Sequence, residues 1–201
     1  TKYFPTSPYS ASKASSDHLV NSWYHTYGLP TIISNCSNNY GPYQFPEKLI
    51  PLTILKGIKG EHIPLYGDGL HVRDWLYVED HVEALLLISK QGEIGKSYCI
   101  GGLGEKTNKE VQYGICNILD QFVSKGFPHS SLIRNVKDRP GHDRRYAINS
   151  NRIIEELGWR PKTTFEDGLE KTVNWYLRNL DWCDYIMKNS GYSGGRMGIK
   201  K

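Results

Sequence analysis

The sequence has few of the patterns that mark metal, redox and membrane proteins. Its four cysteines lie far apart without a C-x-x-C pair, and its seven histidines include no H-E-x-x-H motif. No apolar run reaches the roughly 18 residues that a membrane span needs, and no long run of Lys or Arg indicates nucleic acid binding. We therefore expect no metal, membrane or nucleic acid partner, and free thiols in a reducing cytoplasm.

A complete dinucleotide-binding fingerprint is also missing. The cluster GGLGEKTN places Gly102 and Gly104 at the first two glycine positions, but Thr107 stands at the third. We interpret this cluster as a strand-to-helix turn without a phosphate. The first residues, TKYFPTSPYS, have no apolar core of the signal-peptide type and begin with Thr, so we expect a fragment of a longer cytoplasmic protein.

The composition that remains is that of an ordinary globular protein, with 38% hydrophobic and 23% charged residues and a net charge of +4. Hydrophobic periodicity and Gly/Pro punctuation predict alternating helices and strands. Helices are expected over residues 8–27, 47–58, 79–90, 108–123, 150–158 and 164–189, and strands over residues 31–37, 62–66, 71–78, 96–102 and 131–138. This alternation predicts an α/β fold with parallel strands in the first half and a smaller α/β lobe in the second.

The segment SPYSASKASSDHLV raises a first functional question. Ser7 and Pro8 are typical of a helix start, and Tyr9 and Lys13 then lie on one helix face. A cation near a phenol favours the phenolate, which can take a proton from a substrate hydroxyl. With 14 tyrosines in the chain, about one Y-x-x-x-K is expected by chance, so an ordinary helix surface is the alternative.

The loop SNNYGPYQFPEK carries Asn38, Asn39 and Lys48 among aromatic residues. Amide side chains can bind sugar hydroxyls or a carboxamide, and aromatic rings can pack on a ligand ring. The alternative is a turn-rich loop in which the Asn side chains bind their own backbone.

Arginines mark two further segments, VRDWLYVED and KDRPGHDRRY. Arg73 lies in the first, and Arg139, His142, Arg144 and Arg145 lie in the second. Because the guanidinium group binds phosphate in a bidentate manner, Arg73 and Arg139 are candidates for a diphosphate site. Surface ion pairing with the neighbouring aspartates is the alternative, and we assign Arg144 and Arg145 to it.

Taken together, the segments resemble one family, the dTDP-glucose 4,6-dehydratases, which are extended short-chain dehydrogenase/reductases. The resemblance rests on SPYSASKASSDHLV, NCSNNYGPYQFPEKLIP, PLYGDG, RDWLYVEDHVEAL, DRPGHDRRYAI and ELGWRPKTTFEDGL, which follow one another in the same order as in that family. It covers nearly the whole chain and implies that Tyr9 and Lys13 are the catalytic pair. The Gly-rich turn and the Thr-Asp-Glu segment of the family are missing, so the chain resembles the C-terminal portion.

The resemblance also implies the ligands and the residues that bind them. NAD+ would be held by Tyr9, Lys13 and Asn39. Residues implied for the nucleotide-diphosphate sugar are Asn38, Lys48, Leu49, Pro64, Leu65, Tyr66, Arg73, Asn108, Asp138, Arg139, Pro140, Gly141 and His142. The full-length protein would be a homodimer.

The implied architecture is a partial Rossmann-like parallel sheet with a smaller α/β substrate-binding lobe. Residues 1–36 and 71–101 would be the remainder of the NAD-binding domain, and residues 37–70 and 102–201 the substrate lobe. We expect this chain alone to be inactive, because the NAD-binding turn and the acid and base of the elimination are missing. Two rivals stay open: another nucleotide-sugar epimerase or dehydratase of the superfamily, and a non-catalytic chain that only binds a nucleotide sugar or a partner.

Overall fold

Strand β4 (Val72–Tyr77) is the centre of the largest sheet in the computed structural model, which describes residues 4–192. It pairs in parallel with β2 (Asn38–Tyr40) and β8 (Arg145–Tyr146), and antiparallel with β6 (Glu105–Thr107). From its second residue onward β4 is buried, as is typical of a strand covered on both faces. This sheet joins segments from both predicted parts of the chain.

Two more pairs of strands are parallel. Strand β1 (Ile33–Cys36) pairs with β5 (Ser97–Ile100), and β3 (Ile63–Tyr66) pairs with β7 (Ile133–Val136). Buried and half-buried residues alternate along β3, which is the period of two that a strand imposes on its side chains. The predicted α/β class with parallel strands is confirmed.

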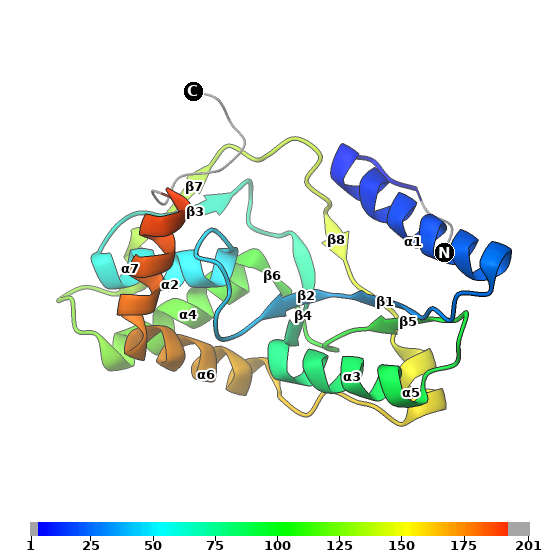
Figure 1. Ribbon diagram of the computed structural model, residues 1–201. Helices are drawn as coiled ribbons and strands as arrows, with labels where there is room; N and C mark the ends of the chain where they lie inside the picture. Colours follow the sequence, from blue (N-terminus) through cyan, green and yellow to red (C-terminus); the bar gives the residue numbers. More distant parts are fainter. Residues whose placement is uncertain (1–3, 193–201) are drawn as a thin grey trace.

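Helices cover both sides of the strands. In Figure 1, α1 (Pro8–Tyr27) and α3 (Val78–Gln91) lie on opposite sides of β1 and β5, and α5 (Asn151–Leu157) lies beside α3. The remaining helices are α2 (Leu49–Lys59), α4 (Asn108–Phe122), α6 (Phe165–Arg178), α7 (Leu180–Ser190) and the short 3-10 helix η1 (His129–Leu132). Within residues 4–192, no helix has the length and apolar character needed to cross a membrane.

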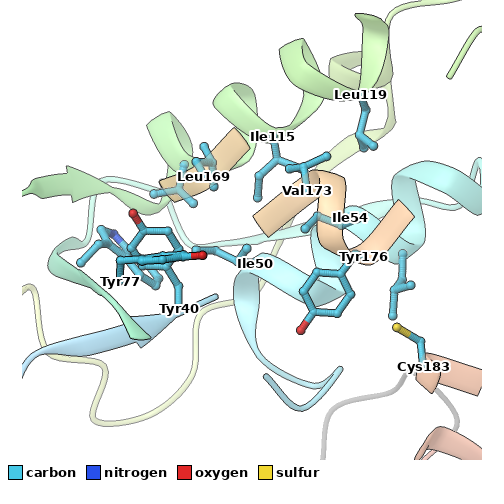
Figure 2. Packing of buried hydrophobic residues seen from close by; sticks show 13 residues of the cluster. Tyr40, Ile50, Ile54, Tyr77, Ile115, Leu119, Leu169, Val173, Tyr176 and Cys183 are labelled. Atoms are coloured by element: carbon cyan, nitrogen blue, oxygen red, sulfur yellow. The ribbon is translucent and has the colours of Figure 1, made fainter. Parts of the chain in front are cut away.

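The main hydrophobic core lies where α2, α4 and α6 pack on one another (Figure 2). Its fully buried side chains include Ile50, Ile54, Ile115, Leu119, Val173 and Tyr176. Each buried aliphatic side chain of this size contributes about 1.5–3 kcal/mol. A second core cluster under α3, with Leu76, Tyr98 and Ile100, holds β5 against β4 and α3. The elements that carry the candidate site are therefore fixed by packing.

Several helix ends agree with the sequence prediction. Ser7 Oγ accepts a hydrogen bond from the Ser10 N–H at 3.1 Å, and Thr164 Oγ1 accepts one from the Asp167 N–H at 3.1 Å. Thr107 caps α4 in the same way. Gly158 ends α5 with φ +67°, a left-handed conformation that suits glycine.

Three predictions were wrong. Asn38–Tyr40, expected in a loop, forms β2, and Glu105–Thr107, expected in a turn, forms β6; both are strands because β4 pairs with them. The single helix expected over residues 164–189 is broken at Asn179, which has φ −128° and donates its side-chain N–H to the Trp175 carbonyl at 2.7 Å. Residues 1–3 and 193–201 of the predicted parts lie outside the described residues.

Candidate functional site

A cavity of about 870 Å³ collects most of the predicted site residues. Its walls come from α1, β2, β3, β4 and β7, from α2 and the segment before it, from the first turns of α4, and from the segment after β7. The predicted residues that line it are Tyr9, Asn38, Asn39, Lys48, Leu49, Pro64, Tyr66, Arg73, Asn108, Arg139 and His142. The fold thus brings together side chains that are separated by more than a hundred positions in the sequence.

The other predicted residues do not line this cavity. The Leu65 side chain is buried in the core, because β3 alternates its two faces, so a role toward a nucleotide has to use the Leu65 backbone. Lys13 is exposed on α1, one turn after Tyr9. Asp138 lies behind the wall, and Pro140 and Gly141 are exposed in the loop that follows it.

Two arginines meet at the cavity without a carboxylate partner among the described residues. Arg73 is only 7% exposed, and its guanidinium donates to the backbone carbonyls of Val72 and Asp143, both at 2.7 Å. Burial, and then the positive charge of Arg139, lower the pKa of Arg73, while the charge of Asp143 opposes that shift. Both arginines line the same cavity. A pair of like charges on one wall favours a ligand with adjacent negative charges.

The neighbouring arginines are engaged in surface ion pairs, as the sequence predicts, but their partners are carboxylates from distant segments and not the neighbouring aspartates. Arg144 is paired with Asp68 at 2.8 Å, and Arg145 donates from Nε to Glu105 at 2.9 Å. Both pairs are exposed to solvent. In this loop Arg139 therefore lines the cavity, whereas Arg144 and Arg145 are paired with carboxylates at the surface.

His142 lies on the cavity wall and is held from behind by a carboxylate. Its Nδ1 is 2.7 Å from Asp138 Oδ1. Burial lowers the pKa of His142, while the bond to Asp138 opposes that shift; the same bond lowers the pKa of Asp138. The bond to Asp138 therefore fixes the orientation of the His142 ring on the cavity wall.

The amide pair on β2 has one buried group without a partner. Asn39 donates its side-chain N–H to the Ser37 carbonyl at 3.1 Å and to Cys36 Sγ at 3.2 Å, whereas Asn39 Oδ1 is buried and accepts no hydrogen bond from the described residues. Such an acceptor is costly to leave unpaired. Its position on the cavity wall fits a ligand that carries an N–H donor.

The backbone N–H groups of the glycine cluster bind a side chain of the same protein. The N–H groups of Gly102 and Gly104 each donate to the buried carboxylate of Asp74, both at 3.0 Å. A Cβ on Gly102 would lie 1.8 Å from the Trp75 carbonyl oxygen, so the close approach of two backbones requires glycine there. These N–H groups bind a carboxylate of the same chain instead of a phosphate.

The first turn of α1 places Tyr9 at the rim of the cavity, where its side chain is 75% exposed. Tyr146 on β8 lies nearby. Burial raises the pKa of Tyr146, and smaller contributions in the same direction come from Cys36 and Tyr9. Tyr146 is thus a neighbour of Tyr9 that the sequence analysis missed.

Further lining residues were not predicted, among them Gln44, Gln112 and Tyr192. Gln112 is buried and donates to the Pro64 carbonyl at 2.9 Å, which fixes β3 to α4. It stands four residues after Asn108, so the helical period was a signal that could have found it. Tyr192 follows the last helix and carries no local pattern.

Three comparisons place this geometry among known proteins. A dTDP-glucose 4,6-dehydratase of Escherichia coli is 57% identical over 192 residues, which are 96% of this chain and 53% of that protein. The dTDP-glucose 4,6-dehydratase of Bacillus anthracis, solved in complex with NAD, has a TM-score of 0.85 and 49% identity, and covers 92% of this chain and 57% of that chain. A UDP-glucose 4-epimerase of Thermotoga maritima, solved with UDP-glucose, has a TM-score of 0.78 and 27% identity over 88% of this chain and 55% of that chain.

This chain spans about half the length of the curated relatives that it matches. The resemblance to dTDP-glucose 4,6-dehydratases is confirmed by these comparisons. Residues 1–172 match the family model described as GDP-mannose 4,6 dehydratase, and the chain therefore belongs to that family.

Proposed function

We propose that this chain is the part of a dTDP-glucose 4,6-dehydratase that holds the nucleotide-diphosphate sugar and the Tyr/Lys pair. The whole enzyme converts dTDP-glucose to dTDP-4-keto-6-deoxyglucose and water, with NAD+ regenerated in each cycle. High identity to dTDP-glucose 4,6-dehydratases supports this substrate over that of an epimerase. Residues 1–36 and 71–101 belong to the NAD-binding part, and residues 37–70 and 102–201 to the substrate lobe.

The observation that carries the proposal is the pair Arg73 and Arg139. One is buried, the other is exposed, and neither has a carboxylate partner within the described part of the chain. A diphosphate between them would satisfy the remaining guanidinium N–H groups and remove the repulsion of two like charges. His142 adds a third group on the same wall.

The remaining lining residues serve the sugar and the nucleotide. Asn38 binds the sugar, and the residues from α2, β3 and α4 surround the nucleotide: Lys48, Leu49, Pro64, Tyr66 and Asn108. The backbone of Leu65 and the loop residues Asp138, Pro140 and Gly141 complete this pocket. Apolar walls with a few placed polar groups are typical of small-ligand sites.

Tyr9 and Lys13 perform the first chemical step. Tyr9 takes the proton of the sugar C4 hydroxyl, and Lys13 supplies positive charge one helical turn away. NAD, when bound, supplies the acceptor for the hydride of that alcohol. The unpaired Asn39 Oδ1 fits the carboxamide N–H group of a nicotinamide ring.

The proposal includes a homodimer in the cytoplasm. Helix α1 buries only Ala14 and exposes Leu19, Trp23 and Tyr27, which is apolar surface that a second copy would cover. All four cysteines are free, as in proteins of reducing compartments. Light scattering of the natural-length protein tests the dimer, and a monomer at micromolar concentration would contradict it.

Product analysis tests the proposed reaction. The natural-length protein is incubated with dTDP-glucose and NAD+, and the nucleotide product is identified by mass spectrometry and NMR. We expect the loss of one water and a 4-keto-6-deoxy sugar. A product of unchanged mass with an inverted C4 centre would instead identify an epimerase, and binding without turnover would identify a non-catalytic nucleotide-sugar binding protein.

A further inference from the structure

Three titratable side chains form a cluster at the cavity wall, where one of them lines the cavity and two lie behind it. His71 immediately precedes β4, and Asp138 and His142 both lie in the segment between β7 and β8. His71 Nε2 is 3.2 Å from Asp138 Oδ2, and His142 Nδ1 is 2.7 Å from Asp138 Oδ1. The two imidazole rings stack with centroids 3.7 Å apart and planes 13° from parallel. One carboxylate thus connects two stacked rings from different segments of the chain.

The ring geometry indicates a clamp of two stacked imidazoles on one carboxylate and not a metal site. Ligand atoms of the three residues lie within 4.8 Å of one another. Nearly parallel rings, however, direct their nitrogen lone pairs side by side, whereas ligands of one ion must point to a common centre. His71 Nδ1 is buried without a partner among the described residues, and Nε2 is the ring nitrogen that contacts Asp138.

The same carboxylate orients the residue that carries the cavity guanidinium. Asp138 Oδ1 also accepts the backbone N–H of Arg139 at 2.8 Å. The turn before His71 packs on Asp138 so closely that a Cβ on Gly67 would lie 3.0 Å from Oδ2. His71 further accepts the Asn108 N–H on its backbone carbonyl at 3.0 Å. His71 is therefore in contact, directly or through Asp138, with three segments that line the cavity.

Resting on the nucleotide-diphosphate pocket proposed above, we propose that His71 is a positioning residue for that pocket. It does not line the cavity and is 5% exposed. Its Nε2 contacts Asp138 and its ring stacks on His142, and Asp138 fixes the Arg139 backbone and the His142 ring in the geometry that receives the diphosphate. Preorganisation of this kind lowers the ordering cost of binding.

The test compares four variants of the natural-length protein by calorimetric titration with dTDP. His71→Phe keeps a ring to stack on His142 but loses the Nε2 atom, and His71→Gln keeps an N–H group near the place of Nε2. His71→Asn places its amide nearer to Nδ1 and does not reach Asp138. Asp68→Asn is the matched control. It removes an exposed ion pair to Arg144 that joins the turn before His71 to the segment that carries Asp138 and His142.

We expect His71→Phe and His71→Asn to bind dTDP about tenfold more weakly than the wild type, which is the size of one hydrogen bond to a charged group. His71→Gln and Asp68→Asn should stay within about twofold, since exposed pairs contribute little. In turnover assays the KM for dTDP-glucose should rise while kcat is kept. A purely structural His71 would lower the melting temperature in all three His71 variants without this order of affinities.

The outcomes separate this inference from the proposed function. If wild-type protein does not bind dTDP, the pocket itself is wrong. If wild type binds dTDP and His71→Phe and His71→Asn bind it equally well, only the role of His71 is wrong. A melting temperature that rises with Zn²⁺ in the wild type, and not in His71→Gln, would overturn the clamp in favour of a metal site.

Discussion

Replacing Arg139 by Ala isolates one guanidinium of the cavity. The Arg139 side chain is exposed and makes no hydrogen bond or ion pair with other described residues, so its removal leaves no buried group unpaired. A hydrogen bond to a charged phosphate contributes about 1.5–3 kcal/mol, which corresponds to a roughly 10- to 150-fold higher Kd for dTDP. Loss of the Arg139 charge also removes its electrostatic repulsion of Arg73. The melting temperature of the unliganded variant should therefore be no lower than that of the wild type.

Calorimetric titration with dTDP at fixed ionic strength measures this effect. Arg144→Ala and Arg145→Ala are charge-matched controls from the same loop, and because both side chains are paired at the surface, each should change Kd by less than about threefold. Arg139→Lys should fall between Arg139→Ala and the wild type, since it keeps the charge and loses the bidentate fork. Equal effects of Arg139→Ala and the two controls would refute the assignment.

Three further results are expected. In the natural-length protein, Tyr9→Phe should abolish turnover and leave dTDP-glucose affinity nearly unchanged; an equal loss of affinity would make Tyr9 structural. Gly102→Ala should lower the free energy of unfolding by at least about 3 kcal/mol in urea, because its Cβ would meet a backbone carbonyl, whereas Gly104→Ala, with its nearest atom at 3.5 Å, is the control. Asp120 accepts from the backbone and ring of buried His129, which lowers the Asp120 pKa. This stabilisation is present above the unfolded pKa of about 3.9 and is lost as the pH falls through the lower folded pKa, so Asp120→Ala should cost about 1.5 kcal/mol at pH 7 and progressively less in acid.

Cap residues and hydrophobic periodicity predicted the helices and strands that are defined by neighbouring residues in the sequence. Ser7 and Thr164 cap the beginnings of their helices and Gly158 caps the end of its helix, as their chemistry requires. The order of helices and strands follows from hydrophobic periodicity. The strands β2 and β6 were missed because only their pairing with β4 defines them, and a polar run such as Asn38–Tyr40 has no strand pattern of its own.

Candidate site residues could be predicted where the chemistry of a side chain indicates a ligand. Contacts between segments that are distant in the sequence could not be predicted. Arg73 and Arg139 could be chosen as candidate phosphate ligands from their chemistry, and both line the cavity. That Asp74 would occupy the glycine cluster, or that His71 would stack on His142, depends on the packing of β4 against other segments. No local pattern in the sequence carries that information.

A crystal structure of the natural-length protein with dTDP tests the central claim most directly. The account predicts that the diphosphate lies in the cavity of about 870 Å³, with the guanidinium groups of Arg73 and Arg139 both at about 2.7–3.0 Å from phosphate oxygens. A nucleotide bound elsewhere, or one whose phosphates contact Arg144 and Arg145 in place of these two, would contradict it.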